Sequence, residues 1–408
     1  MAQSFENLKS AGSSALAASA SAHLQSCFPA AAQALHTYSA PGRVNLIGEH
    51  IDYNGGMVFP CAVNHSVTMA IRLADKANAD RLRFCSKNFS GQFEIDLTQP
   101  ITRQGDNWVN YPLAVIEQLQ KSGKSIGGFD VCFYGDLPGG AGLSSSAAIE
   151  IVTAFALNEL FDLQFSRLDL VKICQKAENE FIGVACGIMD QFAVAMASEE
   201  HALQLDCNTL EYEHVPVKLE QSVFIIANTN QQRGLAEGGY NERVKECQRA
   251  LEIVREHSSN AVNTLAEIEP ESLPALRPFF RDDTIVFNRL QHVCTEQQRV
   301  IAATTALKSG NLSSFGKLMT ASHQSLRDLY EVSSQPLDAM VDAALNTPGT
   351  MGSRLTGAGF GGCTISLVET EHLDSWLTQV RAAYEKATDL VVDFYAFQPA
   401  AGVNAINS

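Results

Sequence analysis

The sequence predicts an α+β protein of two domains, with a mixed sheet and helices in its first half and a helix-rich second half that carries a small sheet. Its 408 residues are enough for two domains of ordinary size. Apolar runs between turn residues predict strands mainly before residue 230, and amphipathic patterns predict helices mainly after it. We place the boundary near residues 210–225, which gives domains at 1–220 and 221–408.

The elements of the first half follow one another at short intervals. Residues 1–36 predict one or two helices, and residues 37–56 begin as a strand and become a polar loop. Strands are then expected at 57–73, 81–97, 129–134, 201–206 and 222–228, and helices at 107–121, 147–160 and 167–182.

The second half begins with an amphipathic helix at 243–257, and helical patterns dominate 289–347. The glycine-rich segment GSRLTGAGFGG (352–362) predicts a turn that leads into a strand at 363–369. A helix at 371–387 and a closing strand at 389–397 follow.

Charge and cysteine usage exclude several classes of protein. The formal net charge of −16 opposes nonspecific binding to nucleic acid or to an anionic membrane. No stretch is long and apolar enough to span a bilayer. The ten cysteines are scattered, without a C-x-x-C pair or a Cys/His cluster at zinc spacing. We therefore expect reduced core thiols in a cytoplasmic protein.

The most informative segment is PGGAGLSSSAA (138–148). It lies between a predicted strand and a predicted helix, and its glycines allow the backbone to come close to a ligand. A helix N-terminus offers unpaired N–H groups and a positive dipole end, which suit a phosphate. A glycine turn with one serine cap is the alternative, but a cap needs a single hydroxyl and three serines occur here. The segment is neither a P-loop nor a dinucleotide fingerprint.

Three further segments carry candidate binding groups. Residues 40–56 hold Arg43, Asn45, Glu49, His50, Asp52, Tyr53 and Asn54. This density of hydrogen-bonding groups favours a polyol, and a metal site is the competing interpretation. Residues 177–192 carry Glu178, which could complete a magnesium shell with a serine hydroxyl, and Asp190 in a turn after Gly187, which could orient a hydroxyl. Residues 352–362 predict a loop that closes over the phosphate side.

In this order the segments resemble the galactokinases of the GHMP kinase superfamily. GRVNLIGEHIDYNGG (42–56) resembles the galactokinase signature, PGGAGLSSSAA the ATP-binding motif and SRLTGAGFGGC (353–363) the third motif, while CGIMDQF (186–192) is similar to the segment with the catalytic aspartate. The resemblance runs from about Ser39 to Gln398. It implies a two-domain GHMP kinase fold: an N-terminal mixed-sheet domain like ribosomal protein S5 domain 2, a C-terminal ferredoxin-like α+β domain, and an active site in the cleft between them.

The resemblance also implies an activity, which is phosphorylation of α-D-galactose at its C1 hydroxyl by ATP, the first committed step of galactose catabolism. Arg43 and Asp190 are the implied catalytic residues, with Arg43 stabilising the transferring phosphoryl group and Asp190 facing the hydroxyl. The residues implied to contact galactose are Glu49, His50, Ile51, Asp52 and Tyr240. Those implied to bind the ATP phosphates are Gly140, Ala141, Gly142, Leu143, Ser144, Ser145 and Ser146. Ser146 and Glu178 are the implied ligands of Mg²⁺, and Trp108 and Tyr111 are implied to lie near the adenine. The implied protein is a monomer whose partners are small molecules.

The chain departs from the family pattern at two places. Gln231 and Gln232 follow the Asn-Thr-Asn motif where basic residues are usual, and Gly238-Gly239 precede Tyr240 where an acidic residue is usual. Two other functions stay open. A galactokinase-like sugar sensor binds without turnover, but the intact Ser146-Ala147 pair and Asp190 favour an enzyme. A kinase for N-acetylgalactosamine or arabinose would need a roomier pocket near C2.

Overall fold

The computed structural model describes residues 10–29, 33–138, 142–231, 236–258, 261–281 and 283–406, and within these residues the strands form three sheets. The largest sheet has six strands in the order β13-β1-β3-β6-β4-β5. Their bounds are β1 His36–Asn45, β3 Pro60–Leu73, β4 Arg81–Ser86, β5 Gln92–Asp96, β6 Phe129–Gly135 and β13 Asn404–Ala405. The pair β4–β6 is parallel, and the other pairs of this sheet are antiparallel.

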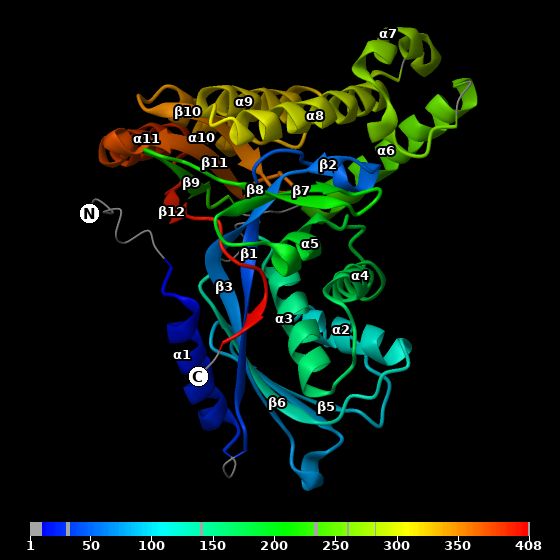
Figure 1. Cartoon of the computed structure of the whole chain (residues 1–408), viewed down its shortest axis with the longest axis vertical. Coiled ribbons are helices and arrows are strands. Elements are labelled where there is room, and N and C mark those ends of the chain that lie inside the picture. Colours follow the sequence, from blue (N-terminus) through cyan, green and yellow to red (C-terminus); the bar gives the residue numbers. More distant parts are fainter. Residues whose placement is uncertain are drawn as a thin grey trace.

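Helices cover both faces of the six-stranded sheet (Figure 1). Helix α1 (Ser13–Cys27) lies on one face, and α2 (Asn110–Lys121), α3 (Ser145–Leu160), α4 (Arg167–Ala177) and α5 (Met189–Met196) lie on the other. Alternate residues of β6 serve the two faces, because Val131 and Phe133 join the large core while Cys132 packs under α1. The large apolar cluster continues from this sheet into the second half of the chain.

Two smaller sheets lie beyond the first. One is β2 (Met57–Val58), β7 (His201–Asp206) and β8 (Tyr212–Pro216), and the other has the antiparallel order β10-β11-β9-β12. Its strands are β9 (Ser222–Asn228), β10 (Thr350–Thr356), β11 (Cys363–Glu369) and β12 (Asp393–Phe397). The helices of this half are α6 (Ala236–His257), α7 (Leu273–Leu276), α8 (Thr284–Lys308), α9 (Leu312–Asp328), α10 (Gln335–Leu345) and α11 (Leu373–Thr388).

The four-stranded sheet is also covered on both faces. Phe224 and Ile226 of β9 join the large core with Phe315 of α9, while Val223 and Ile225 join a second cluster with α10 and α11. The period of two along β9 therefore separates two cores. None of the helices in the described ranges has both the length and the apolar character needed to cross a membrane.

Most predicted elements are confirmed, and the α+β class is confirmed with them. The prediction of a turn from residue 352 is wrong, because β10 extends to Thr356. Glycine serves close packing there, since a Cβ on Gly352 would lie 2.0 Å from the carbonyl oxygen of Gly316 in α9. The helix predicted at 167–182 ends at Ala177 and continues as a π turn over Glu178–Ile182. The boundary after residue 220 stays a prediction, and the last strand, β13, pairs with β1 of the first sheet.

Candidate active site

An ion pair between Arg43 and Asp190 lies at the centre of the candidate site. The guanidinium of Arg43 donates from Nε to Asp190 Oδ1 (2.7 Å) and from Nη2 to Asp190 Oδ2 (2.5 Å). The two hydrogen bonds together fix the plane of the carboxylate. The Ser144 hydroxyl also donates to Asp190 Oδ2. The Arg43 side chain is 6% exposed and that of Asp190 is 30% exposed, so a ligand can reach the carboxylate.

Backbone features bring the two residues together. Asp190 lies in the first turn of α5, where a carboxylate interacts favourably with the helix dipole. The expectation of a turn at Asp190 is therefore wrong, because the helix has already begun at Met189. On β1, a Cβ at Gly42 would lie 2.3 Å from a methyl carbon of Leu137. Glycine at this position lets the strand that carries Arg43 come close to the segment before the phosphate loop.

The described part of the predicted phosphate loop leads into the N-terminus of α3. Ser144 has a φ of 57°, and the helix begins at Ser145. Arg43 anchors the loop, because its N–H donates to the Leu143 carbonyl (3.1 Å) and its Nη1 donates to the Gly142 carbonyl (2.8 Å). The first N–H groups of a helix have no intrahelical acceptor and suit a phosphate. Gly140 and Ala141 lie outside the described residues.

The third glycine-rich motif lies beside this loop. A Cβ on Gly357, whose φ is 85°, would lie 3.2 Å from the Gly142 carbonyl oxygen. The Gly357 N–H donates to Glu49 Oε1 (2.9 Å). The segment after β10 thus lies against both the phosphate loop and the first polar segment, which fits the expected loop on the phosphate side.

A cavity of about 220 Å³ lies next to the ion pair. Pockets for drug-sized ligands have volumes of roughly 300–1,000 Å³, so this one suits a smaller molecule. Its lining consists of Arg43, Glu49, His50, Asp52, Glu178, Val184, Cys186, Gly187, Met189, Asp190, Tyr240, Gly357 and Ala358. The cavity therefore brings together side chains from segments that are up to 315 positions apart, from Arg43 to Ala358.

Asp52 is the second aspartate of the cavity. Burial, together with the charge of Asp190, raises the pKa of Asp52 to about 7. A Cβ on Gly187 would lie 1.8 Å from Asp52 Oδ2, so only glycine fits beside this carboxyl group. A hydroxyl-rich ligand would find in Asp52 an acceptor, and below pH 7 a donor, beside the ionised partner of Arg43.

His50 uses both ring nitrogens within the protein. Burial lowers its pKa to about 3, so the ring is neutral at physiological pH. Because the Ala358 carbonyl can only accept, His50 Nε2 donates to it (3.1 Å), and Nδ1 accepts from the Tyr53 hydroxyl (2.9 Å). The Tyr240 ring lies 5.5 Å from the His50 ring and 5.4 Å from the Tyr53 ring, centroid to centroid. These aromatic contacts form one wall of the cavity.

Tyr240 is preceded by glycine for a steric reason. A Cβ on Gly239 would lie 2.6 Å from the ring of Phe360, so a larger residue at this position would displace that ring. The departure Gly238-Gly239 is thereby partly explained, while Gln232 lies outside the described residues. Gln231 accepts from the Ser334 hydroxyl (2.6 Å), and the structure shows no reason for its replacing a basic residue.

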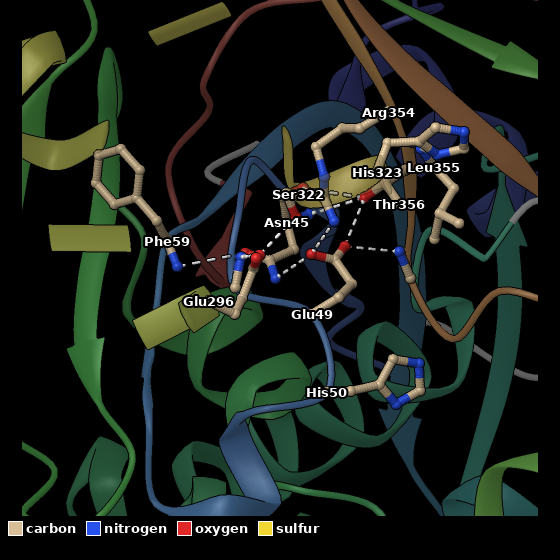
Figure 2. A network of polar contacts seen from close by, with 12 residues as sticks. Asn45, Glu49, His50, Phe59, Glu296, Ser322, His323, Arg354, Leu355 and Thr356 are labelled. Atoms are coloured by element: carbon tan, nitrogen blue, oxygen red, sulfur yellow. Dashed lines mark hydrogen bonds and ion pairs between the residues drawn. The ribbon is translucent and has the colours of Figure 1, made fainter. Parts of the chain in front are cut away.

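Glu49 is held in a buried polar network (Figure 2). It forms an ion pair with Arg354 of β10, and its Oε2 accepts from the Asn45 side chain (2.8 Å). The Glu49 side chain is 2% exposed and that of Arg354 is fully buried. Arg354 also donates to the Asn45 carbonyl (2.8 Å), and the Thr356 hydroxyl lies 3.1 Å from the same oxygen. The network therefore ties the end of β1 to β10.

Glu296 of α8 lies beside this network (Figure 2). It accepts from the Gly48 N–H (2.9 Å), the Ser322 hydroxyl (2.5 Å) and Arg299 Nε (2.6 Å). Burial opposes ionisation, but the nearby positive charges, Arg299 first among them, lower the pKa of Glu296 to about 2. The loop that carries Glu49 and His50 thus rests on an ionised side chain from the second half of the chain.

Glu178 and Ser146 form a candidate magnesium site. The Ser146 hydroxyl hydrogen-bonds to the Glu178 carboxylate, and Gln191 Nε2 donates to both Glu178 (2.5 Å) and Glu150 (3.2 Å). Burial and the charge of Asp190 raise the pKa of Glu178 to about 7. Within the described residues, neither glutamate forms an ion pair, and Glu150 Oε1 is buried without a hydrogen-bond partner. Hard oxygen donors with uncompensated negative charge fit Mg²⁺.

The structure brings most of the predicted site residues together. Among the predicted galactose contacts the exception is Ile51, which is fully buried and does not line the cavity. Trp108 packs against Phe133 and stacks beside Phe89, whose side chain is 53% exposed. Sequence reasoning missed Glu150, Gln191, Glu296 and Arg354. Arg354 lies inside a quoted motif, but an arginine among glycines gives no sign that its partner is Glu49.

Comparison with known protein families agrees with this geometry. Residues 24–73 match the galactokinase galactose-binding signature, residues 110–198 match the GHMP kinases N terminal domain and residues 303–386 match the GHMP kinases C terminal domain. These ranges include β1, the helix α3 that follows the phosphate loop, the helix α5 with Asp190, and the helices α9 and α10.

Individual relatives and solved structures are similar over most of the chain. A galactokinase of Fusobacterium nucleatum is 46% identical over 361 residues, which is 88% of this chain and 92% of that protein. A galactokinase of Halalkalibacterium halodurans is 44% identical over 91% of this chain and 92% of its own. The crystal structure of Lactococcus lactis galactokinase complexed with galactose superposes with a TM-score of 0.91 at 37% identity, over 95% of this chain and 99% of that one. A mevalonate kinase of Methanococcus jannaschii shares the fold. It superposes with a TM-score of 0.64 at 21% identity, over 91% of this chain and 100% of that one.

Proposed function

This chain belongs to the galactokinases of the GHMP kinase superfamily, and we propose that its cavity binds α-D-galactose and that the enzyme transfers the γ-phosphoryl group of ATP to the C1 hydroxyl. The products would be galactose 1-phosphate and ADP. One observation carries the proposal: the Arg43–Asp190 pair lies between a small polar cavity and the loop that leads into α3.

The position of this pair suits a reaction between two bound substrates. Arg43 contacts the phosphate loop through Gly142 and the cavity through Asp190, so one guanidinium reaches both sides of the transfer. A phosphate on the N-terminus of α3 would lie on one side and a sugar hydroxyl on the other. Arg43 would then stabilise the charge that spreads over the transferring group.

Asp190 would orient the hydroxyl and accept its proton late. A sugar hydroxyl is a much weaker acid than a carboxylic acid, whose pKa is near ~4 in water, so early transfer of the proton is uphill. The bidentate pair with Arg43 fixes the orientation of the carboxylate beside the hydroxyl. Phosphoryl transfer passes through a loose transition state that needs little help from the nucleophile, so positioning is sufficient.

Ser146 and Glu178 would hold Mg²⁺. When bound, the ion would neutralise charge on the ATP phosphates. The buried Glu150–Glu178 pair, bridged by Gln191 alone, supports this assignment because a divalent cation would offset its negative charge. The remaining groups shape the sugar site: Glu49, fixed by Arg354, with Asp52, His50 and Tyr240. The exposed face of Phe89 beside Trp108 is our candidate for the adenine.

The decisive experiment measures ADP release by the purified protein with Mg-ATP and galactose, glucose, N-acetylgalactosamine or no sugar. Release that depends on galactose supports the proposal. Release with N-acetylgalactosamine alone would keep the chemistry and change the sugar. Galactose binding without release of ADP would contradict catalysis and place the protein with the sugar sensors.

A further inference from the structure

A cluster of sulfur and imidazole groups lies under α1, away from the catalytic cavity. His23 and Cys27 are four residues apart on α1 and therefore share one helix face. Cys85 of β4 is paired in register with Cys132 of β6, so both side chains point to the same face of the sheet. That face is the one covered by α1.

The ligand atoms of three of these residues lie close together. The imidazole of His23, the thiol of Cys27 and the thiol of Cys85 have donor atoms that all lie within 4.8 Å of one another. Cys27 Sγ is 3.4 Å from His23 Nε2. The thiol of Cys132 is hydrogen-bonded to that of Cys85, which brings a third sulfur to the edge of the group. Cys85 and Cys132 are buried, while His23 and Cys27 are partly exposed, so an ion could enter from solvent.

We propose that His23, Cys27 and Cys85 bind a zinc ion, with Cys132 as the fourth ligand. Zinc takes four sulfur or nitrogen ligands in a tetrahedron, at about 2.3 Å for sulfur and about 2.0–2.1 Å for nitrogen. Donor atoms of such a site are separated by roughly 3.3–3.8 Å, which follows from these bond lengths. His23, Cys27 and Cys85 therefore need to close by about an ångström, and Cys132, which lies outside that group, has to approach further. The protons of the coordinating thiols leave to solvent as the metal–sulfur bonds form.

The position of the site gives the metal a structural role. Helix α1 has 15 residues, no side-chain cap at its N-terminus, and a small apolar contact with the sheet that includes Ala20, Leu24 and Ala70. It is otherwise held by polar contacts such as Arg72 Nη1 to Gln25 (2.8 Å). Two ligands from α1 and two from the sheet would crosslink them. Soft sulfur ligands also separate this site from the all-oxygen chemistry that suits Mg²⁺ at Ser146 and Glu178.

The first test is a titration of the full-length, reduced, metal-free protein with Co²⁺, which replaces zinc and reports sulfur ligands by a thiolate-to-cobalt charge-transfer absorption. We expect one equivalent to bind with that absorption, and one equivalent of Zn²⁺ to abolish it. Cys27→Ser and His23→Gln should each weaken binding by more than about 100-fold, since loss of a residue that only supports a metal ligand already costs about 10–100-fold. Both substitutions are at partly exposed positions, so we expect the variants to fold. Galactose-dependent ADP release or circular dichroism can verify that they do.

Two matched variants make the test specific. Cys207→Ser changes a partly exposed cysteine outside the cluster, and Cys186→Ser changes the cysteine beside Glu178. Both should retain the absorption. In the described part of the chain, a second group with metal-ligand spacing, Glu369, Glu371 and His372, contains no sulfur and cannot produce the absorption. The proposal is wrong if no charge-transfer absorption appears, if Cys27→Ser keeps it, or if Cys186→Ser removes it. The proposal would also be wrong if Cys27 and Cys85 form a disulfide in the protein purified without reductant and the protein takes up no metal after that disulfide is reduced.

Discussion

Two arginine–carboxylate pairs border the same cavity and differ in burial. Arg43–Asp190 leaves 30% of the aspartate side chain exposed, whereas Arg354–Glu49 leaves 2% of the glutamate exposed and none of the arginine. The first pair connects the cavity to the phosphate loop. The second connects the end of β1 to β10 beneath the cavity. In our proposal, similar chemistry therefore serves the reaction in one pair and the shape of the site in the other.

The difference has an energetic consequence. Removing one partner of a buried ion pair strands a charge without water, which costs more than the pair itself contributes. At the first pair, the aspartate is 30% exposed at the cavity, so water can enter the space that it leaves and reach Arg43, which also keeps its hydrogen bond to the Gly142 carbonyl. Substitutions in the two pairs should accordingly separate activity from stability.

Substitution of Asp190 should produce the largest effect and should act on turnover. We expect Asp190→Ala to lose turnover by about 10²–10⁴-fold or more, because the hydroxyl loses its orienting and proton-accepting group. ATP binding and the urea midpoint should change little. Turnover with saturating galactose, ATP affinity and urea unfolding measure the three quantities. Turnover near that of the unchanged enzyme would remove Asp190 from its proposed role, and Asp190→Asn, which keeps the shape, is the matched variant.

Substitution of Arg354 should act first on stability. Arg354→Met leaves Glu49 buried without its cation, so we expect the free energy of unfolding to fall by about 3–5 kcal/mol. The double substitution Glu49→Gln with Arg354→Met should lose less than the single one, because no charge remains unpaired. Urea unfolding of the single and double variants makes the comparison. A double variant that is as unstable as the sum of its parts would contradict the coupling.

The candidate magnesium site gives the third prediction. Glu178 is a buried carboxylate without a cationic partner among the described residues, so a metal ion should replace the arginine that the other two carboxylates have. We expect Glu178→Ala to raise the Mg²⁺ concentration for half-maximal activity by at least about tenfold, as for removal of a group that supports a metal. Glu180→Ala, at a more exposed glutamate two positions away, is the control. An Mg²⁺ titration identical to that of the control would exclude Glu178 from the metal shell.

The same contrast shows why sequence predicted one pair better than the other. Arg43 lies in a segment dense in polar groups and Asp190 in one similar to that of the catalytic aspartate, so the resemblance to galactokinases made both residues candidates from the sequence. Arg354 and Glu296 are far from Glu49 in the chain, and long-range pairing of a buried charge leaves no local pattern. Glu296 has polar neighbours on both sides and Arg354 lies between Ser353 and Leu355, so sequence alone does not distinguish either from a surface position.

The fold shows a similar limit. Apolar runs predicted β6 and α3, which are buried on nearly every side, and amphipathic patterns predicted the long helices of the second half. Nothing in the sequence indicated the short helix α7. Periodicity also missed β8, where Tyr212–Pro216 has few apolar residues and pairs with β7 at an edge, and the two-residue β13. The prediction of a turn at the start of the third motif was wrong. A glycine that allows a neighbouring helix to pack closely, as Gly352 does, cannot be distinguished in sequence from a glycine that turns the chain.

Asp52 offers the smallest effect and the closest link between the two pairs, because its carboxyl lies near Asp190 but has no arginine of its own. Its pKa is raised to about 7 by burial first and by the charge of Asp190 second, so the folded protein binds a proton here between about pH 4 and 7 that the unfolded chain has released. Stability from this group is present at low pH and is lost as the pH rises through 7.

Asp52→Asn removes that dependence, so the free energy of unfolding of the variant, relative to that of the unchanged protein, should increase from pH 5 to pH 8. We expect an increase of about 1–2 kcal/mol, a modest value because the cavity leaves the Asp52 carboxyl group partly hydrated. Urea unfolding of the ligand-free proteins at both pH values measures this difference, and Asp106→Asn, at a fully exposed side chain, is the control. A difference of the opposite sign would show that Asp52 is ionised in the folded state and that Arg43 compensates both aspartates. In that case Arg43, like Arg354, would stabilise buried negative charge in the folded protein in addition to its proposed role in the reaction.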